Sequence, residues 1–150
     1  MSLKEQIDAD IKKAMMARNK EELEALRSIK SLILLAETEK GGPAELNTEA
    51  ETRLLMKGAK QRRESAEIFK QQGREDLAER ELLQLEVIER YLPKQLSEQE
   101  IEEVVRAVIA EVGAQGPQDM GRVMGVITKK LAGQADGKTI SALVKKLLTP

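Results

Sequence analysis

The chain has 150 residues with a formal net charge of -1 at pH 7, and 41% of the residues are hydrophobic, which suits one ordinary domain or two small ones. It contains no cysteine and no histidine, which excludes a disulfide framework, thiolate chemistry and the side chain that most often acts as a base near neutral pH. Only one Phe and one Tyr accompany many Ala, Leu, Glu, Lys and Arg residues, so we expect an all-α fold.

Two helices are predicted in the first 40 residues. Ser2 and Glu5 have the spacing of a capping box, and apolar residues then recur at helical spacing up to about Arg18. A second helix is expected from about residue 21 to 40, with an apolar stripe that stops at the Gly-Gly-Pro sequence of residues 41–43. The apolar middle of this second helix predicts a central position in a bundle.

Two further helices follow in the N-terminal half. Thr48 and Glu51 indicate another capping box, which would open a long helix from about residue 49 to 72. Gly73 is expected to end that helix. A fourth helix is predicted from about residue 75 to 92, where an apolar stripe meets a proline that cannot continue it.

We place a domain boundary at Pro93, between an N-terminal helical bundle of residues 1–93 and a small three-helix domain of residues 94–150. Ser97 and Glu100 have capping-box spacing, and the β-branched residues after them recur with the period of a helix rather than of a strand. The helices predicted in this domain cover about residues 98–112, 120–131 and 140–148.

The stretch AGQADGKTI, residues 132–140, raises the question of a phosphate-binding loop. Such a loop has four residues between its first glycine and Gly-Lys-Ser/Thr, and it lies between a strand and a helix. Here Gly133 is followed by only three residues before Gly137, and an amphipathic helix precedes it. We therefore interpret the stretch as a turn, with Gly133 in the left-handed conformation and Asp136 as the N-cap of the next helix.

Small residues lie on one face of the helix predicted at 120–131, beside its apolar stripe: Gly121, Gly125, Thr128 and Ala132. An interior glycine costs about 1 kcal/mol relative to alanine, so we expect the two glycines to have a compensating role. Close approach of another helix is the simpler explanation, and close approach of an RNA backbone is the alternative.

Positive charge is concentrated in two blocks of the sequence. Residues 53–74 hold seven basic and two acidic side chains, and residues 113–150 hold six basic and two acidic ones. In the second block a spacing of seven residues recurs in each of two helices, which predicts one basic surface, although an ordinary solvated face has the same composition. Its members are Arg122, Lys129, Lys130, Lys138, Lys145 and Lys146. In the first block Arg53, Lys57 and Lys60 form a stripe that the acidic helix after it could neutralise.

No pattern in the sequence indicates catalysis. The carboxylates lie in solvated runs such as SEQEIEE, the serines have no histidine partner, and no cluster has metal-ligand spacing. We therefore expect no catalytic residue, metal or cofactor. No apolar run approaches the roughly 20 residues that span a bilayer, and the N-terminus does not resemble a signal peptide, so we expect a cytoplasmic protein with no membrane partner.

Three blocks resemble the GatB/YqeY family, specifically its free-standing YqeY-like proteins: RRESAEIFKQQGREDLAERE at 62–81, YLPKQLSEQEIE at 91–102 and DMGRVMGVITKKLAGQADGKTISALVKKLL at 119–148. The match covers nearly the whole chain. This resemblance implies a likeness to the helical tail of the B subunit of the tRNA-dependent amidotransferase, which converts Glu-tRNA(Gln) or Asp-tRNA(Asn) to the amidated form. In that enzyme the tail contacts the tRNA body and does no chemistry itself.

On this chain the tail resemblance falls most closely on residues 120–148 and implies that the six cations face RNA. The ATP- and magnesium-binding domain of the B subunit and the amidase subunit have no counterpart here. The family's association with carbon-nitrogen ligase activity, using glutamine as amide donor, is therefore not expected of this chain alone. The sequence predicts an accessory protein that binds tRNA or another structured RNA. The alternative is a helical protein-interaction module that docks on an amidotransferase or another translation-related enzyme.

Overall fold

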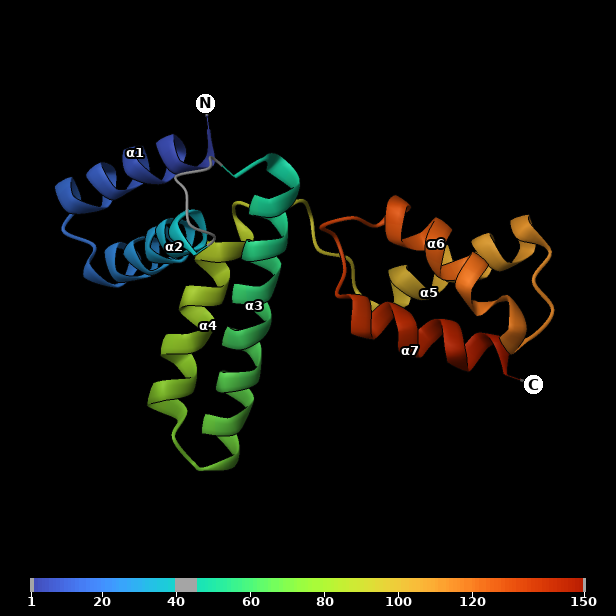
Figure 1. Cartoon of the computed structure of the whole chain (residues 1–150). Helices are drawn as coiled ribbons and strands as arrows, with labels where there is room; N and C mark the ends of the chain where they lie inside the picture. The colour runs from blue at the N-terminus through green and yellow to red at the C-terminus, as the bar shows by residue number, and fades with distance from the viewer. Residues whose placement is uncertain (1, 40–45, 150) are drawn as a thin grey trace. The chain divides into compact units, whose positions relative to one another are not determined.

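A computed structural model describes residues 2–39 and 46–149, and within these ranges the chain forms seven α-helices, one short 3-10 helix and no strand (Figure 1). The predicted all-α fold is confirmed. The chain divides into two compact units, Met1–Pro93 and Lys94–Pro150. The Gly-Gly-Pro sequence expected to end the second helix lies outside the described residues.

The N-terminal unit contains four helices: α1 (Leu3–Met16), α2 (Lys20–Thr38), α3 (Thr48–Gln71) and α4 (Glu75–Glu89). The last two form an antiparallel hairpin, α2 packs against one part of it and α1 packs on α2, so that the hairpin extends beyond them (Figure 1). Gly73 connects the hairpin with a φ of 74°, a left-handed conformation that a side chain would strain.

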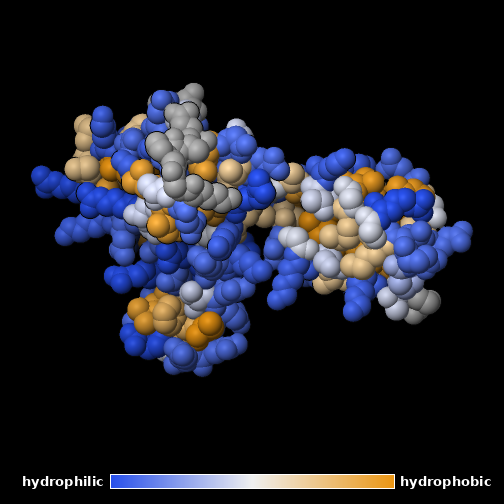
Figure 2. Space-filling model, in the orientation of Figure 1, coloured by the Kyte–Doolittle hydropathy of each residue, from blue (hydrophilic) through white to orange (hydrophobic). Residues whose placement is uncertain are grey.

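The core of the N-terminal unit is aliphatic and draws on all four helices. Its largest fully buried side chains are Ile7, Leu26, Ile29 and Val87. Away from this core the hairpin packs through small residues, and an apolar area is visible at its free end (Figure 2). Ile68 and Leu82, which belong to the hairpin, are exposed by 52% and 37%.

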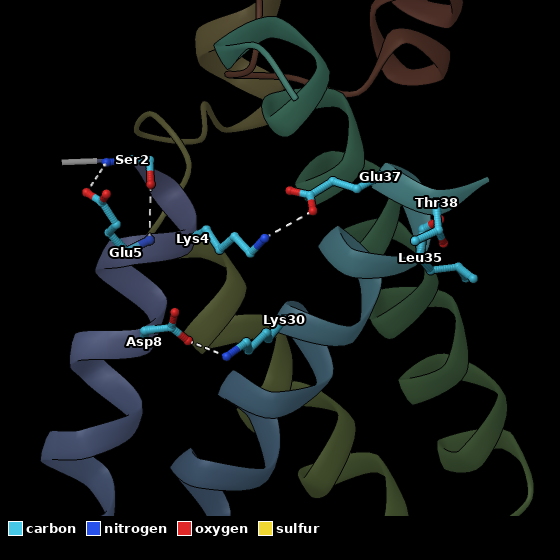
Figure 3. A network of polar contacts seen from close by, with 8 residues as sticks. All are labelled: Ser2, Lys4, Glu5, Asp8, Lys30, Leu35, Glu37 and Thr38. Atoms are coloured by element: carbon cyan, nitrogen blue, oxygen red, sulfur yellow. Dashed lines mark hydrogen bonds and ion pairs between the residues drawn. The ribbon is translucent and has the colours of Figure 1, made fainter. Parts of the chain in front are cut away.

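Local capping rules explain most of the helix starts. The predicted capping boxes at Ser2 and Ser97 are both present, and the first is drawn in Figure 3. The box predicted at Thr48 is wrong, because Asn47 is the N-cap and its Oδ1 accepts a hydrogen bond from the backbone N–H of Ala50 at 2.8 Å. Asn is a stronger N-cap than Thr, so it starts the helix one residue earlier.

Ion pairs across helices brace the N-terminal unit. Lys4 Nζ lies 3.1 Å from Glu37 Oε2, and Lys30 Nζ lies 2.5 Å from Asp8 Oδ1, so two pairs join α1 to α2 (Figure 3). At the end of α4, Tyr91 Oη donates a hydrogen bond to Asp10. Burial and this bond together raise the pKa of the Tyr91 hydroxyl well above its usual value.

A second set of polar contacts fastens the hairpin to α2. Arg62 on α3 reaches Glu81 on α4 at 3.1 Å and donates to Ser28 Oγ on α2 at 2.9 Å. Arg90 lies 2.5 Å from Glu22 at the start of α2. The fourth helix ends at Glu89 rather than near the predicted residue 92, and turn residues lead from there to the proline.

The C-terminal unit is a three-helix bundle of α5 (Glu98–Val112), α6 (Met120–Lys130) and α7 (Gly137–Leu148), with the 3-10 helix η1 (Pro117–Asp119) before α6. Its buried core is entirely Ile, Val and Leu. The ten core residues are Ile101, Val105, Val108, Val123, Ile127, Leu131, Ile140, Leu143, Val144 and Leu148. Among the described residues, none of the helices in either unit is both long and apolar enough to span a membrane.

Candidate nucleic-acid interface

The GKT stretch forms the start of a helix and not a phosphate cradle. Gly133 has a φ of 78°, and Asp136 caps α7 by accepting a hydrogen bond from the backbone N–H of Lys138 at 3.4 Å. The turn that precedes α7 is bonded to the first residues of the C-terminal unit, because the Leu96 N–H donates a hydrogen bond to the Gln134 carbonyl at 2.9 Å. The prediction of a turn is confirmed. The backbone N–H of Lys138, which a phosphate-binding loop would offer to its ligand, already donates to Asp136.

The outer face of α6 is made of glycine and cations. Val123 and Ile127 are fully buried on the opposite face, which turns Gly121, Gly125 and Lys129 toward solvent. A Cβ atom added to either glycine would meet no atom of a neighbouring side chain or element within 4 Å. Within the described C-terminal unit, therefore, no other helix packs closely on these two glycines.

The three cations of α6 have different surroundings. Arg122 lies 3.3 Å from Asp119 one turn earlier, and Lys130 lies 3.3 Å from Glu111 on α5. A backbone N–H bond from Gln115 and the nearby Arg122 guanidinium lower the pKa of Asp119, so this carboxylate stays ionised. Lys129 makes no ion pair with any described residue.

All three cations of α7 are exposed. Lys138 and Lys146 line an open cleft of about 390 Å³ with Glu98 at the start of α5 and with apolar α7 side chains. Lys145 lies on the same face of α7 as Lys138, two turns away. Over the part of the unit that the structure describes, none of these three lysines is ion-paired.

The structure thus divides the six predicted cations by their partners. Four lysines, at 129, 138, 145 and 146, have no carboxylate partner among the described residues, whereas Arg122 and Lys130 are paired. Sequence reasoning missed Asp119 and Glu111 as these partners. The Asp119 pair could have been found, because its spacing of three residues is typical of helical ion pairs. Figure 2 shows hydrophilic, pale and hydrophobic residues mixed on the visible face of the C-terminal unit.

The second basic stripe, on α3, is only partly neutralised. Arg53 lies 3.8 Å from Glu49 on its own helix, and no ion pair with a described residue is formed by Lys57 or Lys60. The acidic α4 instead takes Arg62 and Arg63, through Glu81 at 3.1 Å and Glu89 at 4.0 Å. The carboxylates of α4 therefore pair with cations of α3 that do not belong to the stripe.

No group of three His, Cys, Asp or Glu side chains among the described residues is placed to hold a metal ion. What the C-terminal unit offers chemically is a set of exposed ammonium groups on α6 and α7 and an open glycine face on α6. Exposed ammonium groups of this kind can bind phosphates through charge.

Comparison with models of known families gives the relationship. The model described as Yqey-like protein matches residues 4–148. The chain belongs to the YqeY-like family. The family predicted from the sequence blocks is thereby confirmed.

Two curated relatives of this YqeY-like chain carry the name "Altered inheritance of mitochondria protein 41, mitochondrial". The protein of Clavispora lusitaniae is 35% identical over 127 residues, which cover 83% of this chain and 71% of the relative. That of Pyrenophora tritici-repentis is 31% identical over 146 residues, covering 95% and 78%. A third relative is the E subunit of the glutamyl-tRNA(Gln) amidotransferase of Thermococcus gammatolerans, 40% identical over 55 residues, which cover 34% of this chain and 9% of the relative.

These relatives support one part of the sequence prediction and overturn another. A distant relationship to an amidotransferase subunit is supported. The expected cytoplasmic location is wrong, because both longer matches are proteins named as mitochondrial. That expectation rested on the lack of a long apolar run and of a signal-peptide pattern, which does not distinguish the cytosol from the interior of an organelle.

Proposed function

We propose that the C-terminal unit of this YqeY-like protein binds structured RNA, most concretely tRNA, and that the protein is an accessory factor without chemistry of its own. The observation that carries the proposal is the open outer face of α6, where Gly121 and Gly125 leave the backbone uncovered next to Arg122 and Lys129. The relationship to the tRNA(Gln) amidotransferase subunit points to tRNA as the RNA.

The geometry suits a phosphate backbone. Residues with no side chain let another chain approach a helix closely, and the unpaired lysines beside them supply counter-charges. Gly125 inside α6 and Gly121 in its first turn are poorer helix formers than alanine, and no described side chain of the C-terminal unit packs on either. A ligand that contacts this face would compensate for that loss.

Recognition would rest on backbone charge and shape. The only aromatic residues of the chain are Phe69 and Tyr91, and both belong to the N-terminal unit. The C-terminal unit therefore has no stacking surface of the kind that binds single-stranded bases. Folded RNA, whose phosphates are fixed in space, is the better partner.

The first test measures tRNA affinity against salt concentration. Neutralising about four phosphates predicts a slope of log affinity against log salt of about -3 to -4. Replacing two unpaired lysines, as in Lys129→Glu with Lys145→Glu, should weaken binding and make the slope shallower. The matched control is Lys12→Glu with Lys13→Glu on α1, where both lysines are exposed. If the two double variants changed tRNA affinity equally, or if neither changed it, the proposed RNA-binding surface would be rejected.

The second test separates the glycine face from the charges. Gly121→Ala with Gly125→Ala adds two methyl groups in open space, so it should raise helix stability by up to about 1 kcal/mol at each site. If RNA contacts this face closely, the same variant binds tRNA more weakly although it is more stable. Unchanged affinity in the stabilised variant would show that RNA does not approach α6 there.

A protein-interaction module is the alternative, and the amidotransferase relationship favours it too. The same outer face would then contact a subunit of such an enzyme. Nuclease-treated pull-downs that recover an amidotransferase subunit and no RNA, with loss of that subunit in the Gly121→Ala and Gly125→Ala variant, would favour this alternative.

A further inference from the structure

Two neighbouring leucines of α2 project from the outer side of that helix. Leu34 is 40% exposed and Leu35 is 61% exposed. The residue before them, Ile33, is buried in the core, so the helix turns both leucines toward solvent. Figure 3 shows the Leu35 side chain on the side of α2 turned away from α1. Large apolar side chains exposed next to each other, and not singly, point to a contact surface.

The basic stripe of α3 runs beside these leucines. Arg62 on α3 donates to Ser28 on α2 at 2.9 Å, and a Cβ atom added to Gly58 on α3 would lie 3.3 Å from the Leu32 side chain on α2. The two helices are therefore antiparallel at this contact. Leu35 lies about one turn beyond Leu32, which places it beside the turn of α3 that precedes Gly58. That turn belongs to the stripe.

Positive charge predominates around the leucines. Residues 27–38 of α2 and 50–60 of α3 hold five basic and two acidic side chains. Both acids, Glu37 and Glu51, line a small cleft with the start of α1. No ion pair with a described residue is made by Arg27, Lys57 or Lys60. These three cations and the two leucines are called the α2–α3 outer face below.

Cations around projecting aliphatic side chains match the surface of an anionic membrane. The lipid headgroups carry the negative charge, and the acyl boundary just beneath them accepts leucine side chains. RNA supplies the negative charge but has no apolar layer for the leucines. A helix of a protein partner docks in an apolar groove, whereas Leu34 and Leu35 project from the ridge of a single helix. A lipid surface therefore uses both features of this face.

We propose that the α2–α3 outer face binds the surface of an anionic membrane, with the two leucines inserted among the headgroups and the three cations on the lipid phosphates. This face belongs to the N-terminal unit, so its binding is independent of the RNA surface proposed for the C-terminal unit. Either proposal can fail while the other stands.

Co-sedimentation of the full chain with vesicles tests the charge. Vesicles of equal parts phosphatidylcholine and phosphatidylglycerol should bind the chain, and vesicles of phosphatidylcholine alone should not. Binding should weaken as salt is added, because salt screens the attraction. Each basic residue near such a surface contributes roughly fivefold in affinity, so Lys57→Gln with Lys60→Gln should weaken binding about tenfold or more.

The insertion of the leucines needs its own variant. Leu34→Gln with Leu35→Gln keeps the charge, and glutamine resembles leucine in helix propensity. This variant should weaken binding to the charged vesicles about tenfold, since two apolar side chains no longer leave water. The matched control is Ile68→Gln with Leu82→Gln on the hairpin, where the exposed fractions of 52% and 37% are similar. The control should bind as the native chain does, and thermal melts should show that both variants are folded.

Three results would overturn the proposal. The first is equal binding to charged and neutral vesicles, or no binding to either. The second is an equal loss in the two apolar double variants. The third is loss of vesicle binding in Lys129→Glu with Lys145→Glu, which would assign the contact to the C-terminal unit. If Lys57→Gln with Lys60→Gln weakened tRNA binding and left vesicle binding intact, the cations of this face would serve RNA, and the proposal would likewise be overturned.

Discussion

The two units of this protein use their charged residues differently. In the N-terminal unit ion pairs join helices that are distant in sequence, such as Lys4 with Glu37 and Arg90 with Glu22. In the C-terminal unit most pairs are local, as between Arg122 and Asp119, and the core is aliphatic alone. Ion pairs therefore connect separate helices in the first unit, whereas in the second unit they lie mostly between residues close in sequence.

This difference predicts where a substitution will be felt. A cation of the N-terminal unit that bridges helices should matter for folding, and an exposed cation of the C-terminal unit should matter for binding. Hydrophobic truncation should be severe in both units, but each unit should respond separately.

The largest expected effect is that of core truncation. Ile127→Ala removes a fully buried side chain from the C-terminal unit and should cost about 2–5 kcal/mol of unfolding free energy. Tyr91, the only tyrosine of a chain without tryptophan, belongs to the N-terminal unit. Far-ultraviolet circular dichroism should therefore show an earlier partial transition while the tyrosine fluorescence transition stays in place.

Leu26→Ala, in the core of the N-terminal unit, is the matched control. It should move the fluorescence transition by a comparable amount and leave the C-terminal part of the dichroism signal unchanged. If both probes shift together in both variants, the units unfold as one and the comparison fails.

An intermediate effect is expected from a bridging cation. Arg62→Ala would remove contacts to Glu81 and Ser28, in a setting where the Arg and Glu side chains are only 28% and 16% exposed. We expect a loss of roughly 1–3 kcal/mol by denaturant titration. Arg122→Ala, at a side chain that is 55% exposed, should cost about 0.5 kcal/mol or less. Similar losses from the two would remove the distinction between the units.

A smaller effect than that of Arg62→Ala concerns a single hydrogen bond. Tyr91→Phe removes the donor to Asp10 and should cost about 1 kcal/mol at neutral pH. The folded-state pKa of Tyr91 is raised, so its contribution is complete below the ordinary tyrosine pKa of about 10 and declines as the pH rises above that value. The stability difference between the native chain and Tyr91→Phe should therefore shrink at high pH. A constant difference would mean that the hydroxyl is not held by this bond.

The sequence predicted the helices well because their determinants are local. Apolar spacing, capping pairs and the Gly73 and Pro93 interruptions act over a few residues. The one capping error arose where Asn47 and Thr48 compete for the same role, which spacing alone does not decide. Whether another helix covers Gly121 and Gly125 depends on how the helices pack together. The residue pattern of a single helix does not determine that packing.

The candidate surface was predicted only in part for the same reason. All six cations could be placed on two helices from their spacing. The pairing of Lys130 with Glu111, however, joins two residues that lie nineteen positions apart on different helices. The cellular location could not be predicted, since composition does not record it.

The short segment that opens the C-terminal unit sets a limit on how that unit can be cut out. Leu96 and Gln95 donate to the carbonyls of Gln134 and Gly133, and so they close the bend between α6 and α7. A fragment that starts at Lys94 would keep both donors. One trimmed to Glu98 would lack them, so a crystallographer or spectroscopist wanting the isolated bundle should retain those four extra residues.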